Sequence, residues 1–135
     1  MHNVIYVGDG SARFPAPQVN YSMPKLVVQL QPHREPHLDL AAVTRLFSDG
    51  ALMADAELQV SQGLDDVPYV NYDFVASDVQ RLWRVLQNQV MEDSTVSGAL
   101  SKAAVVVCEG EHGWNDYLLL HHYDRREALE DPPER

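Results

Sequence analysis

The chain has 135 residues, 45% of them hydrophobic, and its 20 acidic residues against 10 basic ones give a formal net charge of −10. This length and apolar content predict one globular domain with its own core and exclude a wholly disordered chain. The negative charge repels phosphate backbones and anionic lipids, which disfavours direct binding to nucleic acids or membranes.

Cysteine usage and the apolar segments indicate the compartment. The chain has 1 cysteine and so forms no internal disulfide, which fits a reducing environment. The first residues, MHNVIYVGDG, lack the basic region and the long apolar core of a signal peptide. The longest apolar run, residues 103–108, is too short to span a bilayer. We therefore expect a soluble, cytoplasmic protein.

Residues 1–24 predict an extended arm. The run VIYV favours a short strand at 3–7, and Pro15, Pro17 and Pro24 then block a long helix. A phosphate loop needs a helix directly after its glycines, so we interpret VGDGS as a glycine turn.

The next segment predicts a strand followed by a helix. KLVVQLQ, residues 25–31, alternates in the way of a half-buried strand, and residues 32–37 form a connector. Asp39 is placed to cap the helix, and Asp49–Gly50 is typical of a helix end. The apolar stripe of this helix comprises Leu40, Val43, Leu46 and Phe47.

An antiparallel hairpin is expected next. Residues 56–63 and 69–76 both alternate apolar and polar side chains, and a short polar loop joins them. The inward-facing side chains would be Leu58, Val60, Val70, Tyr72 and Phe74.

A second helix begins at Ser77, which forms a capping-box pattern with Gln80. A loop at 91–103 follows, with a helical turn ending near Leu100. The apolar face of the helix, which we expect in the core, comprises Val79, Leu82, Trp83, Leu86 and Val90.

Two further strands complete the domain. Residues 104–110 are continuously apolar, as in a strand covered on both faces, and residues 117–124 return after a turn at HGWND. The charged tail, 125–135, is expected to fray. Over 25–124 this element order resembles the ferredoxin-like two-layer sandwich, an α+β fold with an antiparallel sheet and two helices on one face.

The sheet face opposite the helices is unusually apolar in this arrangement. A face of that kind is rarely left open to water, so we expect the arm, a partner or ligand, or a second copy of the chain in a homodimer to cover it. Its apolar residues would be Val27, Tyr69, Val75, Val105, Val107, Tyr117, Leu119 and Tyr123.

The stretch 108–124 is rich in residues that occur in functional sites. His121 and His122 point to opposite faces of a strand unless a bulge intervenes, and a structural zinc site needs four Cys or His ligands, so we expect no metal and no cofactor. Two alternatives remain open: a catalytic set of His112, His121 and Asp116, and a nucleophilic pair of Cys108 and His122.

Acidic residues gather on the two hairpins. No Lys or Arg lies between Arg45 and Arg81. Trp114 is expected at the tip of the second hairpin, either folded back or offered to a partner. Solubility alone also explains the acidic charge. The predicted partner-binding residues are Asp55, Glu57, Asp65, Asp66, Glu109, Glu111, Trp114 and Asp116.

These features favour a non-catalytic protein-binding domain. In size and charge the chain resembles small bacterial immunity proteins, which neutralise toxins, and this resemblance implies a basic protein partner. One alternative is a small-ligand-binding protein or small enzyme with a pocket between sheet and helices, whose polar groups would be Tyr72, Cys108 and His122. Another is an accessory subunit that docks through its open sheet face.

Overall fold

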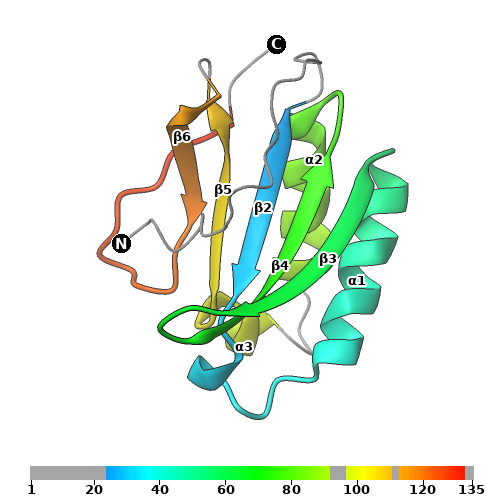
Figure 1. The fold of residues 1–135 in the computed structure, drawn as a ribbon. Helices are drawn as coiled ribbons and strands as arrows, with labels where there is room; N and C mark the ends of the chain where they lie inside the picture. The colour runs from blue at the N-terminus through cyan, green and yellow to red at the C-terminus, as the bar shows by residue number, and fades with distance from the viewer. Residues whose placement is uncertain (1–23, 92–96, 111–112, 133–135) are drawn as a thin grey trace.

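The computed structural model describes residues 24–91, 97–110 and 113–132 and shows an α+β fold built on one antiparallel sheet (Figure 1). The expected strand at 3–7 and the arm as far as residue 23 lie outside the described residues. In chain order the elements are β2 (Lys25–Leu30), the 3-10 turn η2 (Pro32–Arg34), α1 (Leu40–Met53), β3 (Glu57–Leu64), β4 (Pro68–Val75), α2 (Val79–Leu86), the π-helical turn η3 (Gln87–Met91), α3 (Ser97–Ser101), β5 (Ala104–Gly110) and β6 (Gly113–His121).

The sheet has the strand order β3-β4-β2-β5-β6, and every neighbouring pair is antiparallel. In the central strand β2, Leu26 lies opposite Phe74 and Cys108, and Leu30 lies opposite Val70 and Ala104. The β3–β4 turn and the end of β5 therefore lie at opposite ends of the sheet (Figure 1).

One face of the sheet forms the main core with the helices. The alternating residues of β2, β4 and β5 supply one side of it, and α1 and α2 supply the other. The Phe47 ring lies between Tyr72 and Phe74, with centroid distances of 4.5 and 5.8 Å. Trp83 is 6% exposed and Leu86 is 0% exposed, which confirms their predicted place in the core.

The other face carries a smaller apolar cluster, as its sequence predicts. Val27, Val105, Val107 and Leu119 are buried there, and Trp114, Tyr117 and Tyr123 pack against them. Gln29 and Gln31 of the same strand face are also buried, and the Gln31 amide donates to Gln29 Oε1 at 2.9 Å. This hydrogen bond offsets part of the cost of removing both amides from water.

The first helix begins as predicted but ends later. Asp39 caps it by accepting a hydrogen bond from the Ala42 amide at 3.1 Å. The predicted stop at Asp49–Gly50 is wrong, because the helix continues to Met53. Gly50 serves packing instead of ending the helix: a Cβ at this position would lie 3.0 Å from the Leu86 side chain on α2.

The second helix begins one residue later than expected. Its N-cap is Asp78, whose carboxylate accepts from the Arg81 amide at 3.0 Å, and Ser77 is not the cap. Gln80 makes no capping-box contact; its amide donates to the Pro132 carbonyl at 3.3 Å. A capping carboxylate also interacts favourably with the helix dipole, which favours aspartate over the neighbouring serine.

The last strand begins earlier and ends earlier than the predicted range 117–124, because it spans Gly113–His121. β6 begins at Gly113, so Trp114 and Asp116 lie within the strand and not in a turn. Its pairing with β5 shifts register between Val106 and Val107, because Val106 lies opposite His121 whereas Val107 lies opposite Leu119. This β-bulge reverses the side-chain alternation near the end of the strand.

The C-terminal tail follows the outer edge of β6 in the described residues. The Glu130 amide donates to the Leu119 carbonyl at 2.8 Å, and Glu130 Oε1 accepts from the Leu119 amide at 2.9 Å. The tail then reaches α2, where Pro132 accepts from Gln80. The sequence predicts that this tail frays, and in the structure backbone groups within 125–132 pair with a strand edge that would otherwise be open.

Candidate protein-binding surface

The strand β3 forms an edge of the sheet and pairs, among the described residues, with β4 alone. Most of its side chains are exposed, including Val60 at 45% and Leu64 at 77%. The sequence ELQVSQGL contains neither proline nor lysine, the residues that commonly protect edge strands from pairing with other chains. An edge of this kind offers unpaired backbone donors and acceptors to a partner.

Carboxylates lie at both ends of this edge strand. Asp55 and Glu57 are exposed at its start, and Asp65 and Asp66 are exposed at its end. The eight residues of β3 separate the two pairs by about 27 Å along the strand. These four carboxylates, together with the exposed apolar side chains Leu52, Met53, Val60 and Leu64, are called the β3 edge surface below.

The link from α1 to β3 fixes the position of Asp55. The Ala56 amide donates to the Ala51 carbonyl at 2.8 Å, and the Asp55 amide donates to the Leu52 carbonyl at 3.2 Å. These are the two bonds of a Schellman motif, in which the residue after the helix adopts a left-handed conformation. Asp55 accordingly has a φ of 59°, where glycine is the favoured residue.

The second predicted acidic cluster lies elsewhere. Glu109 and Asp116 belong to β5 and β6, at the far side of the sheet from β3. Glu109 Oε1 accepts from the Lys25 amide at 2.7 Å, so this carboxylate holds neighbouring strands together. Glu111 lies outside the described residues. The structure therefore does not bring the two acidic clusters into one surface.

Trp114 is partly buried and packs against the outer apolar cluster. Of the two alternatives left open by the sequence, folding back over its own hairpin is the one that this packing favours. Its place on the outer face also separates it from the carboxylates beside β3.

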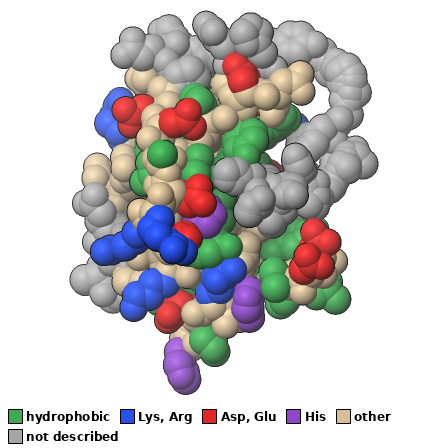
Figure 2. Space-filling model, turned by 90° about the vertical axis from the view of Figure 1, so that its left-hand side faces the viewer, with side chains coloured by type: hydrophobic (Ala, Val, Ile, Leu, Met, Phe, Trp, Pro, Cys, Tyr) green, Lys and Arg blue, Asp and Glu red, His purple; other side chains and the backbone are tan. Residues whose placement is uncertain are grey.

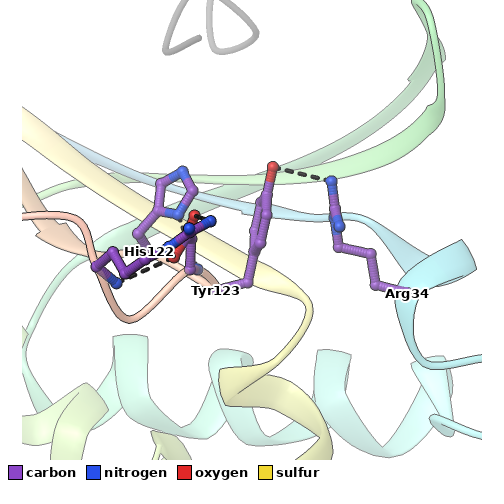
Figure 3. Close-up of polar contacts among 5 residues, drawn as sticks. Arg34, His122 and Tyr123 are labelled. Carbon is purple, nitrogen blue, oxygen red and sulfur yellow. Dashed lines mark hydrogen bonds and ion pairs between the residues drawn. The ribbon is translucent and has the colours of Figure 1, made fainter.

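A stack of three side chains joins the end of β6 to η2 (Figure 3). The Arg34 guanidinium lies 3.6 Å from the centroid of the Tyr123 ring and donates to the Tyr123 hydroxyl at 2.9 Å. His122 stacks on the same tyrosine at a centroid distance of 4.3 Å. Tyr123 packs against the outer apolar cluster, on the sheet face away from the main core. The stack fastens the connector after β2 to the last strand.

The β6 side of the molecule carries basic side chains. Figure 2, which looks onto the β6 side, shows Lys and Arg side chains gathered in the lower part of the face. Arg125 and Arg126 directly follow this strand, and Arg126 forms a salt bridge of 3.0 Å with Asp124. This ion pair lowers the pKa of Asp124 to about 2. The β6 side (Figure 2) therefore carries charges of both signs, whereas residues 55–66 of the first hairpin include no Lys or Arg.

The residues of the predicted pocket are divided between the two faces. Tyr72 and Cys108 are fully buried in the helix-side core, where the Tyr72 hydroxyl is 2.7 Å from Thr44 Oγ1. His122 stacks on Tyr123 beside the outer cluster instead. Burial, with smaller contributions from the Glu109 and Glu130 carboxylates, raises the pKa of the Cys108 thiol to about 12. A protonated, buried thiol is a poor nucleophile.

The histidines and carboxylates of the described residues form no cluster of three or more that could hold a metal ion, and His112 lies outside those residues. His121 bonds through Nε2 to the Ser101 carbonyl at 3.0 Å. Burial lowers the pKa of His121, and the bond to Ser101 partly offsets this shift. Within the same part of the chain, no helix has the length and apolar character needed to cross a membrane.

A groove lies where the C-terminal tail crosses α2. It has a volume of about 380 Å³ and is lined by Gln80, Trp83, Arg84, Gln87, Asp131 and Pro132. Sequence reasoning missed this groove because the tail was expected to fray. The Pro-Pro pair at 132–133, which favours an extended chain, was the one signal that the tail would not form a helix.

Comparisons with protein-family models, with curated proteins and with solved structures find no match to this chain.

Proposed function

We propose that this chain is a non-catalytic, acidic protein-binding domain of the immunity or inhibitor type, which captures a basic protein through the β3 edge surface. The observation that carries the proposal is the combination of four exposed carboxylates at the two ends of β3 with exposed apolar side chains on the strand, Val60 and Leu64, and at the end of the preceding helix, Leu52 and Met53. Carboxylates at the rim would speed the encounter with a basic partner, and burial of the apolar side chains would slow its release.

Two further proposals concern the fold family and the cellular location of the chain. A ferredoxin-like sandwich with one strand added at the β6 edge is our interpretation of the fold, supported by the order β3-β4-β2-β5 and by the core cluster that α1 and α2 share. A cytoplasmic location is supported by the single cysteine, which is buried and free.

The proposed function is tested with two baits that lose the same charge at different edges. The variant Asp65→Asn/Asp66→Asn neutralises two of the four carboxylates of the β3 edge surface, and the control Asp116→Asn/Glu127→Gln neutralises two carboxylates on the β6 side. Each bait, and the wild-type chain, is used to recover proteins from the native host at several salt concentrations. We expect a basic protein that the wild type and the control retain and the first variant loses.

Recovery of the same protein by all three baits would contradict the proposed surface. Recovery of an acidic protein would contradict the proposed charge complementarity. A toxin-like reading frame next to the gene, encoding the recovered protein, would support the immunity-type assignment.

Small-ligand binding is the second candidate function, and the groove between α2 and the tail favours it. Arg84 and Asp131 place opposite charges on its walls, and the largely buried Trp83 supplies an apolar surface. Such a lining suits a small zwitterion, such as an amino acid. A panel of free amino acids that leaves the melting temperature of the wild-type chain unchanged would contradict this candidate.

A further inference from the structure

We propose that the basic partner contributes an extended segment that adds to the sheet as a sixth strand beside β3. This inference rests on the proposed function and specifies how the partner binds. Strand addition to an open sheet edge takes its affinity from main-chain hydrogen bonds and its specificity from alternate side chains. It requires an edge strand that is long, exposed and free of residues that prevent pairing.

The length and the exposure of β3 suit the addition of a strand. The strand has eight residues, and Glu57, Gln59, Val60, Ser61, Gln62 and Leu64 are all exposed. The opposite edge of the sheet differs, because the tail already bonds to Leu119 of β6 through the Glu130 amide and carboxylate. Of the two edges, β3 is therefore the one open to a partner in the described residues.

The spacing of the carboxylates along β3 indicates the shape and charge pattern of the partner segment. Asp55 and Glu57 lie at one end of the strand and Asp65 and Asp66 at the other, about 27 Å away along eight residues. A compact cation can reach only one of these pairs. An extended segment with basic residues about eight positions apart reaches both, and apolar side chains between them can contact Val60.

A second copy of this chain is a poor occupant of the same edge. Antiparallel pairing of two β3 strands would place Asp55 and Glu57 of each copy beside Asp65 and Asp66 of the other. Like charges opposite one another destabilise strand pairing, and each chain carries a net charge of −10. Charge complementarity therefore selects a basic segment over a homodimer.

The test uses a nine-residue amidated peptide, Lys-Lys-Val-Thr-Val-Thr-Val-Lys-Lys, and a twin that is N-methylated at alternate residues. The twin keeps the charge and the side chains but cannot complete the ladder. Binding is followed together with amide hydrogen exchange in the full-length chain. We expect the first peptide to slow exchange of alternate amides in residues 57–64 about ten-fold or more, with amides of β5 unchanged. The twin should bind more weakly and give no protection.

The two proposals fail in different ways. Equal binding of both peptides at residues 55–66, without protection of β3, would overturn strand addition and leave acidic capture in place. No salt-dependent binding of either peptide would overturn both. In the matched variants, Val60→Lys should lose the protection, and Asn115→Lys, which adds the same charge to an exposed site on β6, should retain it. Retained protection in Val60→Lys would also overturn strand addition.

Discussion

Asp55 has two roles that place different demands on one residue. It adopts the left-handed conformation that ends α1, with a φ of 59°, and it presents an exposed carboxylate at the start of the β3 edge surface. Left-handed geometry costs an ordinary residue roughly 1–2 kcal/mol, and aspartate somewhat less because its short side chain tolerates this region. The Schellman motif at the end of α1 accounts for this geometry.

Substitution of this residue separates the two roles. Asp55→Gly relieves the backbone strain and should raise the free energy of unfolding by about 0.5–1 kcal/mol, measured by urea denaturation. Asp55→Asn tolerates the same φ and should leave stability nearly unchanged. Both variants should associate more slowly with a basic peptide, because both lose the carboxylate. A destabilised glycine variant would contradict the role of the left-handed geometry.

His121 makes stability depend on pH. Burial lowers its pKa in the folded chain below the usual 6.5, so the unfolded chain binds the proton more readily. Above about pH 7 His121 is neutral in both the folded and the unfolded chain and does not make the free energy of unfolding depend on pH. As the pH drops below about 6.5, the unfolded chain takes up the proton first, and the free energy of unfolding falls. Urea denaturation should show a smaller loss from pH 7.5 to pH 5.5 in His121→Gln than in the wild type. An equal loss in both proteins would contradict this account.

At the scale of the elements, alternation and helical periodicity placed most strands and helices correctly. Leu26, Val28 and Leu30 face the core as their spacing predicts, and Asp39 caps α1. The misplaced boundaries have tertiary causes. Gly50 is typical of a helix end in sequence, but here its missing side chain makes room for Leu86 on the next helix.

The candidate site, too, could be predicted from the sequence only where it does not depend on tertiary contacts. The concentration of acidic residues on the first hairpin could be read from the sequence, as could the absence of bases between Arg45 and Arg81. Strand order could not, because it depends on pairing across the sheet. That order places Glu109 far from β3 and next to Lys25, which removes it from the predicted binding surface.

Packing between α1, α2 and the sheet should dominate the stability of the domain. Leu86 is 0% exposed in the core, so Leu86→Ala should lower the free energy of unfolding by roughly 2–5 kcal/mol. Leu52 is 80% exposed near the end of α1, and Leu52→Ala should change stability by less than about 0.5 kcal/mol. Chemical denaturation measures both. A loss below about 1 kcal/mol for Leu86→Ala would contradict the assigned core.

At the scale of the whole molecule, the chain combines a sheet with two apolar faces and two unlike edges. The tail bonds to the β6 edge, whereas no other segment of the described residues pairs with the outer side of β3. What covers the outer apolar cluster remains a prediction from the sequence, with residues 1–22 and a second copy as the alternatives. The two alternatives differ in the oligomeric state that they predict.

Deletion of residues 1–22 distinguishes them. If the arm is the cover, the full-length chain should be a monomer and the truncated chain should aggregate or dimerise, because the outer cluster would become exposed. If a second copy is the cover, light scattering should show a dimer before truncation as well. A truncated chain that is monomeric and soluble would contradict both alternatives.

The most direct test of the acidic β3 edge surface is a nuclear magnetic resonance titration of the isotopically labelled chain with a nine-lysine peptide. We expect amide shifts to concentrate at residues 52–66 and to weaken steeply as salt is raised, since the Debye length shortens to about 10 Å at 0.1 M. Asp65→Asn/Asp66→Asn should reduce the shifts, and Asp116→Asn/Glu127→Gln should leave them nearly unchanged. Shifts concentrated at residues 113–121, or equal shifts in the two variants, would contradict the central claim.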